Sequence, residues 1–119
     1  MKSGSRRAGI SRAASFEPFT PKVPMAAYLI ADVVLSDAAA YETYRQQVPA
    51  IIAAYGGRYL VRGGETERLE GTRLPNRTVV LEFPTMDALK TFWDSPEYRP
   101  LRALRERAAT SNIFAVAGL

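Results

Sequence analysis

The chain has 119 residues, enough for one hydrophobic core and too few for two. Its apolar fraction of 47% and charged fraction of 24% are those of a globular protein and argue against a disordered or fibrous chain. Cysteine and histidine are both absent, which excludes disulfides, thiolate and histidine catalysis and the commonest ligands of transition metals. We therefore expect neither a metal nor a tightly bound cofactor.

The net charge of +4 belongs to the beginning of the chain. Five of the 16 basic and one of the 12 acidic side chains precede Met25, so eleven of each sign remain after it. The rest of the chain is neutral and lacks the basic face that nucleic-acid binding needs. No apolar run approaches the roughly 18 residues of a membrane span. We expect a soluble, cytoplasmic protein that binds neither nucleic acid nor membrane.

Residues 1–24 combine Ser, Gly, Arg and three prolines without apolar periodicity, a composition that predicts a disordered basic tail. The same composition is also typical of an organelle transit peptide. A third interpretation places the true translation start at Met25, directly before the first predicted strand. We favour a tail or a misplaced start over targeting, and we expect a single domain over residues 25–119.

Residues 27–35 are rich in β-branched and aliphatic side chains and predict a strand that is buried on both faces. Ser36 or Asp37 then caps a helix over residues 38–55, where apolar residues recur at spacings of three and four. Pro49 lies inside this pattern and should kink the helix or split it, because proline removes a backbone donor and clashes with the preceding turn.

Gly56-Gly57 supplies a left-handed residue to end this helix. Strands are predicted over residues 58–62 and 77–83, and the segment 65–74 between them should continue the hairpin. A second helix begins at Pro84-Thr85.

Ser95-Pro96 interrupts the second helix, and a further helix follows to about Thr110. Its inward residues are predicted to be Leu101, Leu104 and Ala108, whereas its arginines, Arg105 among them, should be largely solvated. The last strand is predicted over residues 112–116.

The order β-α-β-β-α-β predicts a ferredoxin-like α+β fold, a four-stranded antiparallel sheet with the helices on one face. Apolar residues nevertheless alternate on both faces of the first and third strands. Because a monomer would expose the second set to water, we expect a homodimer in which another copy covers the open face.

Several runs also resemble a known family: Tyr28-Leu29-Ile30-Ala31-Asp32, Tyr55 to Gly64, Leu81-Glu82-Phe83-Pro84, Ser95-Pro96-Glu97-Tyr98 and a late Arg105. In order and spacing they are similar to the domain of unknown function DUF1330, over nearly all of residues 25–119. That family belongs to the dimeric α/β-barrel superfamily, so the resemblance implies two ferredoxin-like sheets paired into a barrel.

Three charged residues stand among apolar neighbours in three strands, and they are the candidate catalytic residues: Asp32, Glu82 and Arg62. In this topology the first and third strands are adjacent, so Asp32 and Glu82 are expected near each other, with Arg62 approaching from a flanking strand. A buried carboxylate is costly unless it is paired. The cluster is therefore either an active site or an ion pair that fixes the strand register or the dimer seam.

The superfamily resemblance implies a ligand between the sheet and the helices. Residues expected to contact it are Tyr41, Tyr44, Trp93, Tyr98 and Asn112, with Phe92 beside them. Aromatic stripes at helical spacing are more often plain core. Arg105 and Asn112 are either surface residues or late additions to the pocket rim.

Two functional hypotheses follow. The first is a metal-free, cofactor-independent enzyme of the monooxygenase or isomerase type, acting on an apolar or anionic small molecule with Asp32 or Glu82 as general base and Arg62 as anion stabiliser. The second is a non-catalytic dimer that binds a ligand or serves as an accessory or stress protein, with a structural charge cluster.

Overall fold

A computed structural model describes residues 25–119; the predicted disordered tail, residues 1–24, lies outside the described residues. The elements are β1 (Ala27–Leu35), α1 (Ala38–Ala54), β2 (Arg58–Arg62), β3 (Thr78–Phe83), α2 (Met86–Trp93), α3 (Arg99–Ala108) and β4 (Ala109–Ala117). The four strands form one antiparallel sheet in the order β2-β3-β1-β4. The predicted ferredoxin-like α+β fold is confirmed, with its second helix in two pieces.

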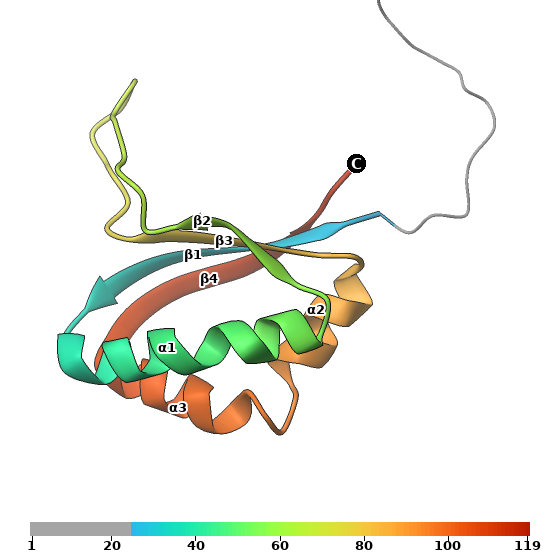
Figure 1. The fold of residues 1–119 in the computed structure, drawn as a ribbon. Helices are drawn as coiled ribbons and strands as arrows, with labels where there is room; N and C mark the ends of the chain where they lie inside the picture. Colours follow the sequence, from blue (N-terminus) through green and yellow to red (C-terminus); the bar gives the residue numbers. More distant parts are fainter. Residues whose placement is uncertain (1–24) are drawn as a thin grey trace, which may run out of the picture.

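All three helices lie against one face of the sheet, and the other face carries no helix (Figure 1). Along β1 the alternation is regular: Ala27, Leu29, Ala31 and Val33 are buried beneath the helices, and the residues between them are half-buried. Side chains of a strand point alternately to its two faces, so this pattern identifies a covered face and an open face of the same sheet. Among the described residues, no helix is long and apolar enough to cross a membrane.

The helix ends follow their local sequence. The Asp37 carboxylate accepts a hydrogen bond from the backbone N–H of Ala40, and the Thr85 hydroxyl accepts one from Ala88, so both residues are N-caps. Gly56 ends α1 with a φ of 84°, a left-handed conformation that glycine adopts without steric cost.

Of the two outcomes predicted for Pro49, a kink or a split of the helix, the split is wrong, because α1 continues through Pro49. Proline at position 49 has no N–H to donate to the carbonyl four residues earlier, which is that of Arg45. In the structure Arg62 donates to this carbonyl from its Nη2 atom at 2.6 Å. A side chain from β2 thus replaces the missing bond of the helix.

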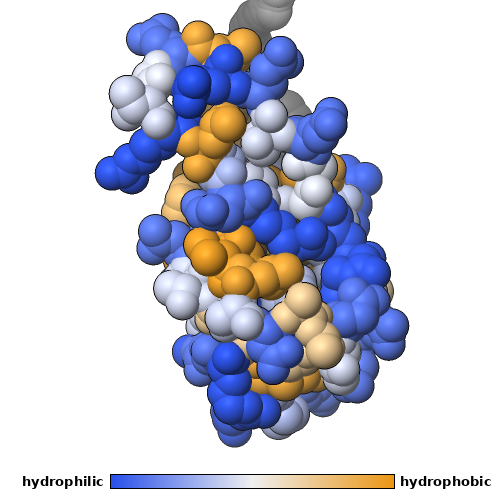
Figure 2. Space-filling view, turned by 90° about the vertical axis from the view of Figure 1, so that its left-hand side faces the viewer, coloured by the Kyte–Doolittle hydropathy of each residue, from blue (hydrophilic) through white to orange (hydrophobic). Residues whose placement is uncertain are grey.

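The segment between β2 and β3 corrects a second prediction. Residues 63–77 contain no strand, although the hairpin was expected to continue over 65–74. Gly63 and Gly71 have φ values of 70° and 90°, and Pro75 cannot donate to a ladder, so the sequence here favours a loop. The loop projects on the side away from the helices (Figure 1), and its Leu69 is 94% exposed. Figure 2 shows orange apolar patches among polar residues on one side of the molecule.

On the open face, one apolar row crosses all four strands. Register pairs Phe114 with Ile30, Ile30 with Val80 and Val80 with Val61, so these four residues lie side by side; we call them the open-face row. Phe114 is 58% exposed. More polar pairs flank the row on either side, which is the arrangement of an interface core within a polar rim.

Candidate functional site

A cavity lies between the covered face of the sheet and the helices α1, α2 and α3. Its free volume is ≈ 40 Å³, room for about three waters. Four tyrosines, four arginines, Phe92 and Trp93 contribute to its wall. Its lining residues are Leu29, Ala31, Val33, Tyr41, Tyr44, Arg45, Val48, Ile52, Tyr59, Arg62, Arg77, Val79, Leu81, Phe92, Trp93, Tyr98, Arg105 and Ile113. No aspartate or glutamate is among them, so the wall carries positive charge only.

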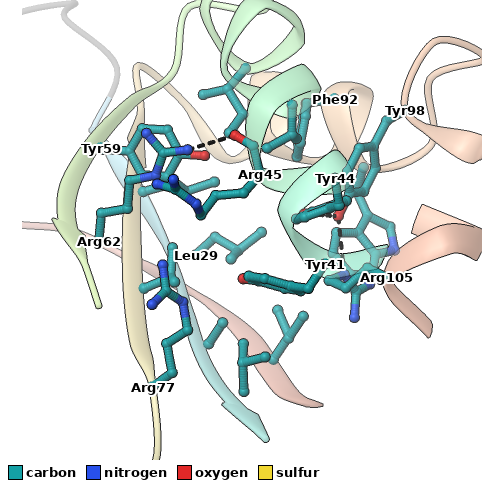
Figure 3. A pocket seen from close by; sticks show the side chains of 18 residues that line it. Leu29, Tyr41, Tyr44, Arg45, Tyr59, Arg62, Arg77, Phe92, Tyr98 and Arg105 are labelled. Atoms are coloured by element: carbon teal, nitrogen blue, oxygen red, sulfur yellow. Dashed lines mark hydrogen bonds between the residues drawn. The ribbon is translucent and has the colours of Figure 1, made fainter. Parts of the chain in front are cut away.

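One side of the cavity, which we call the closed end, is formed by Tyr44, Tyr98 and Arg105 (Figure 3). The Tyr44 and Tyr98 hydroxyls are hydrogen-bonded at 2.9 Å, and Arg105 donates from Nε to the Tyr98 hydroxyl at 3.4 Å. Tyr98 is 2% exposed and Arg105 is 6% exposed. Burial, followed by the neighbouring Tyr98, raises the pKa of the Tyr44 phenol, which therefore stays protonated in neutral solution.

The turn between α2 and α3 positions Tyr98. The Ser95 hydroxyl donates to the Phe92 carbonyl at 2.8 Å and accepts from the Tyr98 backbone N–H at 3.1 Å. The Tyr98 ring then packs on Phe92, with ring centroids 4.4 Å apart. The interrupted helix expected from Ser95-Pro96 is confirmed, and its consequence is that an aromatic hydroxyl points into the cavity.

The opposite side, which we call the mouth, is formed by Arg45, Arg62 and Arg77 (Figure 3). Arg62 is exposed; it donates to the Arg45 carbonyl and lies 4.6 Å from the centroid of the Tyr59 ring. Arg45 is paired with Glu42, whose carboxylate accepts from its Nε and Nη2 atoms at 2.9 and 3.0 Å. This bond holds the pKa of the Glu42 carboxyl below its usual value.

Arg77 reaches the mouth from the start of β3. Its guanidinium lies 5.6 Å from the centroid of the Tyr41 ring, and its Nε atom is buried without a hydrogen-bond partner. Gly63 leaves room for it, because a Cβ atom at that position would collide with the Arg77 guanidinium. The mouth therefore presents positive groups of which only Arg45 has an acidic partner within residues 25–119.

The three candidate catalytic residues do not come together. Asp32 is opposite Thr78 and Glu82 is opposite Tyr28, so the two carboxylates are separated by four residues along β3, about 13 Å. Both lie on the open face, whereas Arg62 lines the cavity on the covered face.

A bulge in β2 explains this separation. The register shifts between Tyr59 and Val61, so that Arg58 is opposite Glu82 while Arg62 is opposite Val79. An extra residue in one strand reverses the face of every residue after it. Regular alternation, assumed in the prediction, would have placed Arg62 on the same face as Glu82.

Each carboxylate has a different partner from the one expected. Asp32 accepts a hydrogen bond from the backbone N–H of Asn76 at 2.7 Å and so fixes the end of the 63–77 loop. Glu82 accepts from Arg58 Nε at 2.7 Å, in an ion pair whose arginine is 72% exposed. The first contact joins β1 to the loop, and the second joins β3 to β2.

Of the predicted ligand-contacting residues, Tyr41, Tyr44, Trp93 and Tyr98 line the cavity, as does Phe92. Asn112 does not, because it is exposed on the open face opposite Asp32.

Arg105 overturns an expectation, since it was predicted to be largely solvated and is buried. The signal was in the helical spacing: Leu101, Arg105 and Ala108, the buried residues of α3, recur at intervals of four and three. Sequence reasoning also missed Tyr59, Arg45 and Arg77 as cavity residues. Arg45 could have been found from the helical spacing, because it lies four residues after Tyr41 and three before Val48, which also line the cavity. Nothing local marks Tyr59 or Arg77, because the face of Tyr59 depends on the pairing of β2 with β3 and Arg77 lies at the end of the loop before β3.

Residues 26–119 match the sequence family described as "Domain of unknown function (DUF1330)". Among curated proteins, none matches the sequence significantly.

Solved structures show a similar fold at low sequence identity. A protein of unknown function from Rhodopseudomonas palustris is 20% identical, with a TM-score of 0.66 over 80% of this chain and 83% of that one. SnoaB, a cofactor-independent oxygenase from Streptomyces nogalater, is 14% identical, with a TM-score of 0.57 over 80% and 94%. A dimeric ferredoxin-like protein of unknown function from Thermobifida fusca is 16% identical, with a TM-score of 0.56 over 80% and 92%.

Proposed function

The chain belongs to the DUF1330 family, and from that premise we propose that it is a homodimeric small-molecule-binding protein that acts as a cofactor-independent enzyme of the monooxygenase or isomerase type. Its ligand is a small apolar molecule that carries an anionic or enolisable group. The fold neighbours include a protein described as a cofactor-independent oxygenase, which is a precedent for this chemistry on this fold and no more.

The observation that carries the proposal is the composition of the cavity wall. It combines aromatic and aliphatic side chains with four arginines and has no acidic residue. Such a wall favours a ligand with an apolar skeleton and a negative charge, because the charge is attracted to the guanidinium groups and the skeleton packs on the rings. The free volume of ≈ 40 Å³ admits a ligand only if side chains at the mouth move. Arg62 is exposed and can move once its bond to the Arg45 carbonyl breaks.

The roles of the candidate catalytic residues remain proposals. Arg62 lines the mouth and is suited to attract and hold an anionic group. Asp32 or Glu82 can act as general base only on a substrate that reaches the open face, where both are already hydrogen-bonded. In the cavity itself, proton transfer falls to the tyrosine hydroxyls or to a water.

The homodimer is proposed to form through the open face. The open-face row is apolar and Phe114 within it is 58% exposed; the fold neighbour from Thermobifida fusca is described as dimeric. A second copy that stacks its own open face on this one would bury both rows around a two-fold axis.

The non-catalytic alternative also has an observation in its favour. Asp32 and Glu82 have structural partners, and the cavity lacks a carboxylate or imidazole to serve as a base. Under this alternative the protein binds the same class of ligand and releases it unchanged.

A binding and turnover assay separates the two. Trp93 is the single tryptophan of the chain and lines the cavity, so its fluorescence reports occupancy. Titration with 1-naphthol, 2-naphthoate and 1,3-indandione should quench it for at least one probe. Oxygen uptake or a product in the presence of that probe supports the enzyme; saturable binding without either supports the alternative. If none of the probes binds, the cavity is not a ligand site and both are wrong.

A further inference from the structure

Resting on the proposed function, we infer that Arg105 is the receptor for a single oxyanion of the ligand at the closed end of the cavity. The geometry behind this is a buried guanidinium that lines the cavity and has no acidic partner. It assigns the ligand class: a small aromatic or conjugated molecule that binds through an ionised oxygen, as a phenolate, an enolate or a carboxylate, and binds poorly when that oxygen is neutral.

The first argument is the unbalanced charge. Arg105 is 6% exposed, and no carboxylate within residues 25–119 lies within 4.0 Å of it. Glu106, its neighbour along α3, is exposed and lies 3.6 Å from Arg102 instead. Burying an ionised group without a counter-ion is costly. An anion in the cavity would remove most of that cost, so the folded protein favours one.

The second argument is the donors of Arg105 that remain without a partner among the described residues. A guanidinium has five N–H groups, and the Nε donor of Arg105 is used by the Tyr98 hydroxyl. That hydroxyl is itself fixed by Tyr44 at 2.9 Å and by the Ser95 turn. This bond and the Trp93 ring, 5.7 Å from Cζ, orient the guanidinium before a ligand arrives, and its terminal N–H groups are left for an oxygen acceptor. Preset donors lose little entropy on binding.

The third argument is the surroundings of that oxygen. The centroids of the Trp93 and Tyr98 rings are 5.8 Å apart. The Cζ atom of Arg105 lies 5.7 Å from the centroid of the Trp93 ring. Tyr41 packs at 5.4 Å from Tyr44 on the other side. Flat rings around a cationic group favour a flat ligand skeleton with its oxygen directed at the charge.

Arg105 differs from the arginines of the mouth. Arg45 is neutralised by Glu42, and Arg62 is exposed, where water and salt screen its field. Arg77 lacks an acidic partner within residues 25–119, as Arg105 does, but it is only half-buried, so its charge is screened more than that of Arg105. These residues attract an anion but discriminate weakly between ionised and neutral ligands. A buried charge is screened far less, so discrimination is expected at the closed end.

The test uses 4-nitrophenol, which ionises near neutral pH, and 4-nitroanisole, the same ring with the oxygen methylated so that it cannot ionise. Both are titrated into the full-length chain while Trp93 fluorescence is followed, with free tryptophan as the control for absorption of light by the probe. We expect 4-nitrophenolate to bind at least tenfold more tightly than 4-nitroanisole, and the bound phenol to ionise at a lower pH than the free phenol. Equal binding of the two probes would overturn the inference.

Three substitutions identify the residue responsible. Arg105→Gln should reduce 4-nitrophenolate affinity by at least tenfold, because a charge-assisted hydrogen bond is lost. It should leave 4-nitroanisole affinity within a factor of about three, because little packing is lost. Arg102→Gln is the matched control: Arg102 is on the same helix and lies 4.5 Å from the Trp93 ring, but it does not line the cavity. Arg62→Gln tests whether the mouth accounts for the preference instead.

The outcomes separate this inference from the function it rests on. If the wild type binds neither nitro probe nor any naphthyl probe, the proposed function fails. If it binds 4-nitrophenolate and the preference is lost in Arg62→Gln but kept in Arg105→Gln, the function stands and the assignment to Arg105 is wrong. Should Arg105→Gln not fold, Arg105→Lys serves in its place: it keeps the charge without the fork, and weaker phenolate binding at unchanged 4-nitroanisole binding supports the inference.

Discussion

The charged side chains on the two faces of the sheet differ in whether they have a bonding partner. On the open face Asp32 is bonded to a backbone N–H and Glu82 to Arg58, so each carboxylate has a partner and remains near water. On the covered face Arg105 and Arg77 are drawn between sheet and helices with no acidic partner among the described residues. Paired charges are common in stable structures, whereas burial of an unpaired charge costs free energy of folding. The unpaired arginines of the covered face therefore indicate that a ligand binds there.

Removal of an aromatic ring from the covered face has the largest expected effect. Phe92 is 1% exposed and packs on Phe83 and Tyr98, so Phe92→Ala should lower the free energy of unfolding by about 3–5 kcal/mol. Chemical denaturation measures it. The loss should not depend on protein concentration, because the cavity lies within one subunit.

Phe114 is the matched control on the open face. Phe114→Ala should lower the stability of the folded monomer by only about 0.5 kcal/mol, since the side chain is mostly exposed there. It should instead weaken the dimer, seen as a smaller mass in light scattering at micromolar concentration and as a concentration-dependent melting temperature. An unchanged dimer would show that the open-face row is not the interface.

Asp32 tests the paired charges of the open face. Asp32→Ala removes the acceptor of the Asn76 N–H and should cost about 1–2 kcal/mol of stability, with probe affinity unchanged. Asp32→Asn, which keeps an acceptor oxygen, should cost less. Loss of turnover in Asp32→Asn or Glu82→Gln with folding intact would instead favour the catalytic role predicted for these residues.

Pro49 and Arg62 connect the two elements of the mouth, and a double-mutant cycle measures that connection. With Pro49 present, Arg62 is the donor to the Arg45 carbonyl; in Pro49→Ala the helix supplies its own N–H. The cost of Arg62→Gln should therefore be smaller in the Pro49→Ala background than in the wild type, with a coupling of about 0.5–1.5 kcal/mol. Additive effects would mean that the missing proline donor is not what holds Arg62.

The smallest expected effect concerns pH at the molecular surface. The Tyr55 hydroxyl donates to Glu97 at 2.7 Å, which lowers the pKa of the Glu97 carboxyl below 4.5 and raises that of the Tyr55 phenol above 10.0. A carboxyl with a lowered pKa contributes stability above pH 4.5, and this is lost as the pH falls through the lowered value. A phenol with a raised pKa contributes stability below pH 10.0, and this is lost as the pH rises through the raised value.

Tyr55→Phe removes both contributions, so its melting temperature should differ from the wild type between these two pH values and converge with it at either extreme. Thermal unfolding over a pH series checks this. A constant difference across the series would attribute the effect to packing.

Much of this protein is determined by local sequence. The capping side chains of Asp37 and Thr85, the left-handed Gly56 and the break at Ser95 are all recognisable in the sequence, because each acts within four residues along the chain. The order of the elements predicted that the helices cover one face of the sheet, and the three- and four-residue spacing predicted the helices themselves. The ligand site between sheet and helices, with its aromatic wall, was implied only by the family resemblance.

Tertiary structure decided which charges meet. The bulge after Tyr59 turned Arg62 away from Glu82, and the Arg45 carbonyl freed by Pro49 received it. Arg105 entered the cavity because its helix packs on α1 through the face that carries Leu101 and Ala108. Periodicity is a local property and fixes which residues are candidates for burial; strand register and helix packing join residues far apart in sequence, and only they determine which partner each buried charge has.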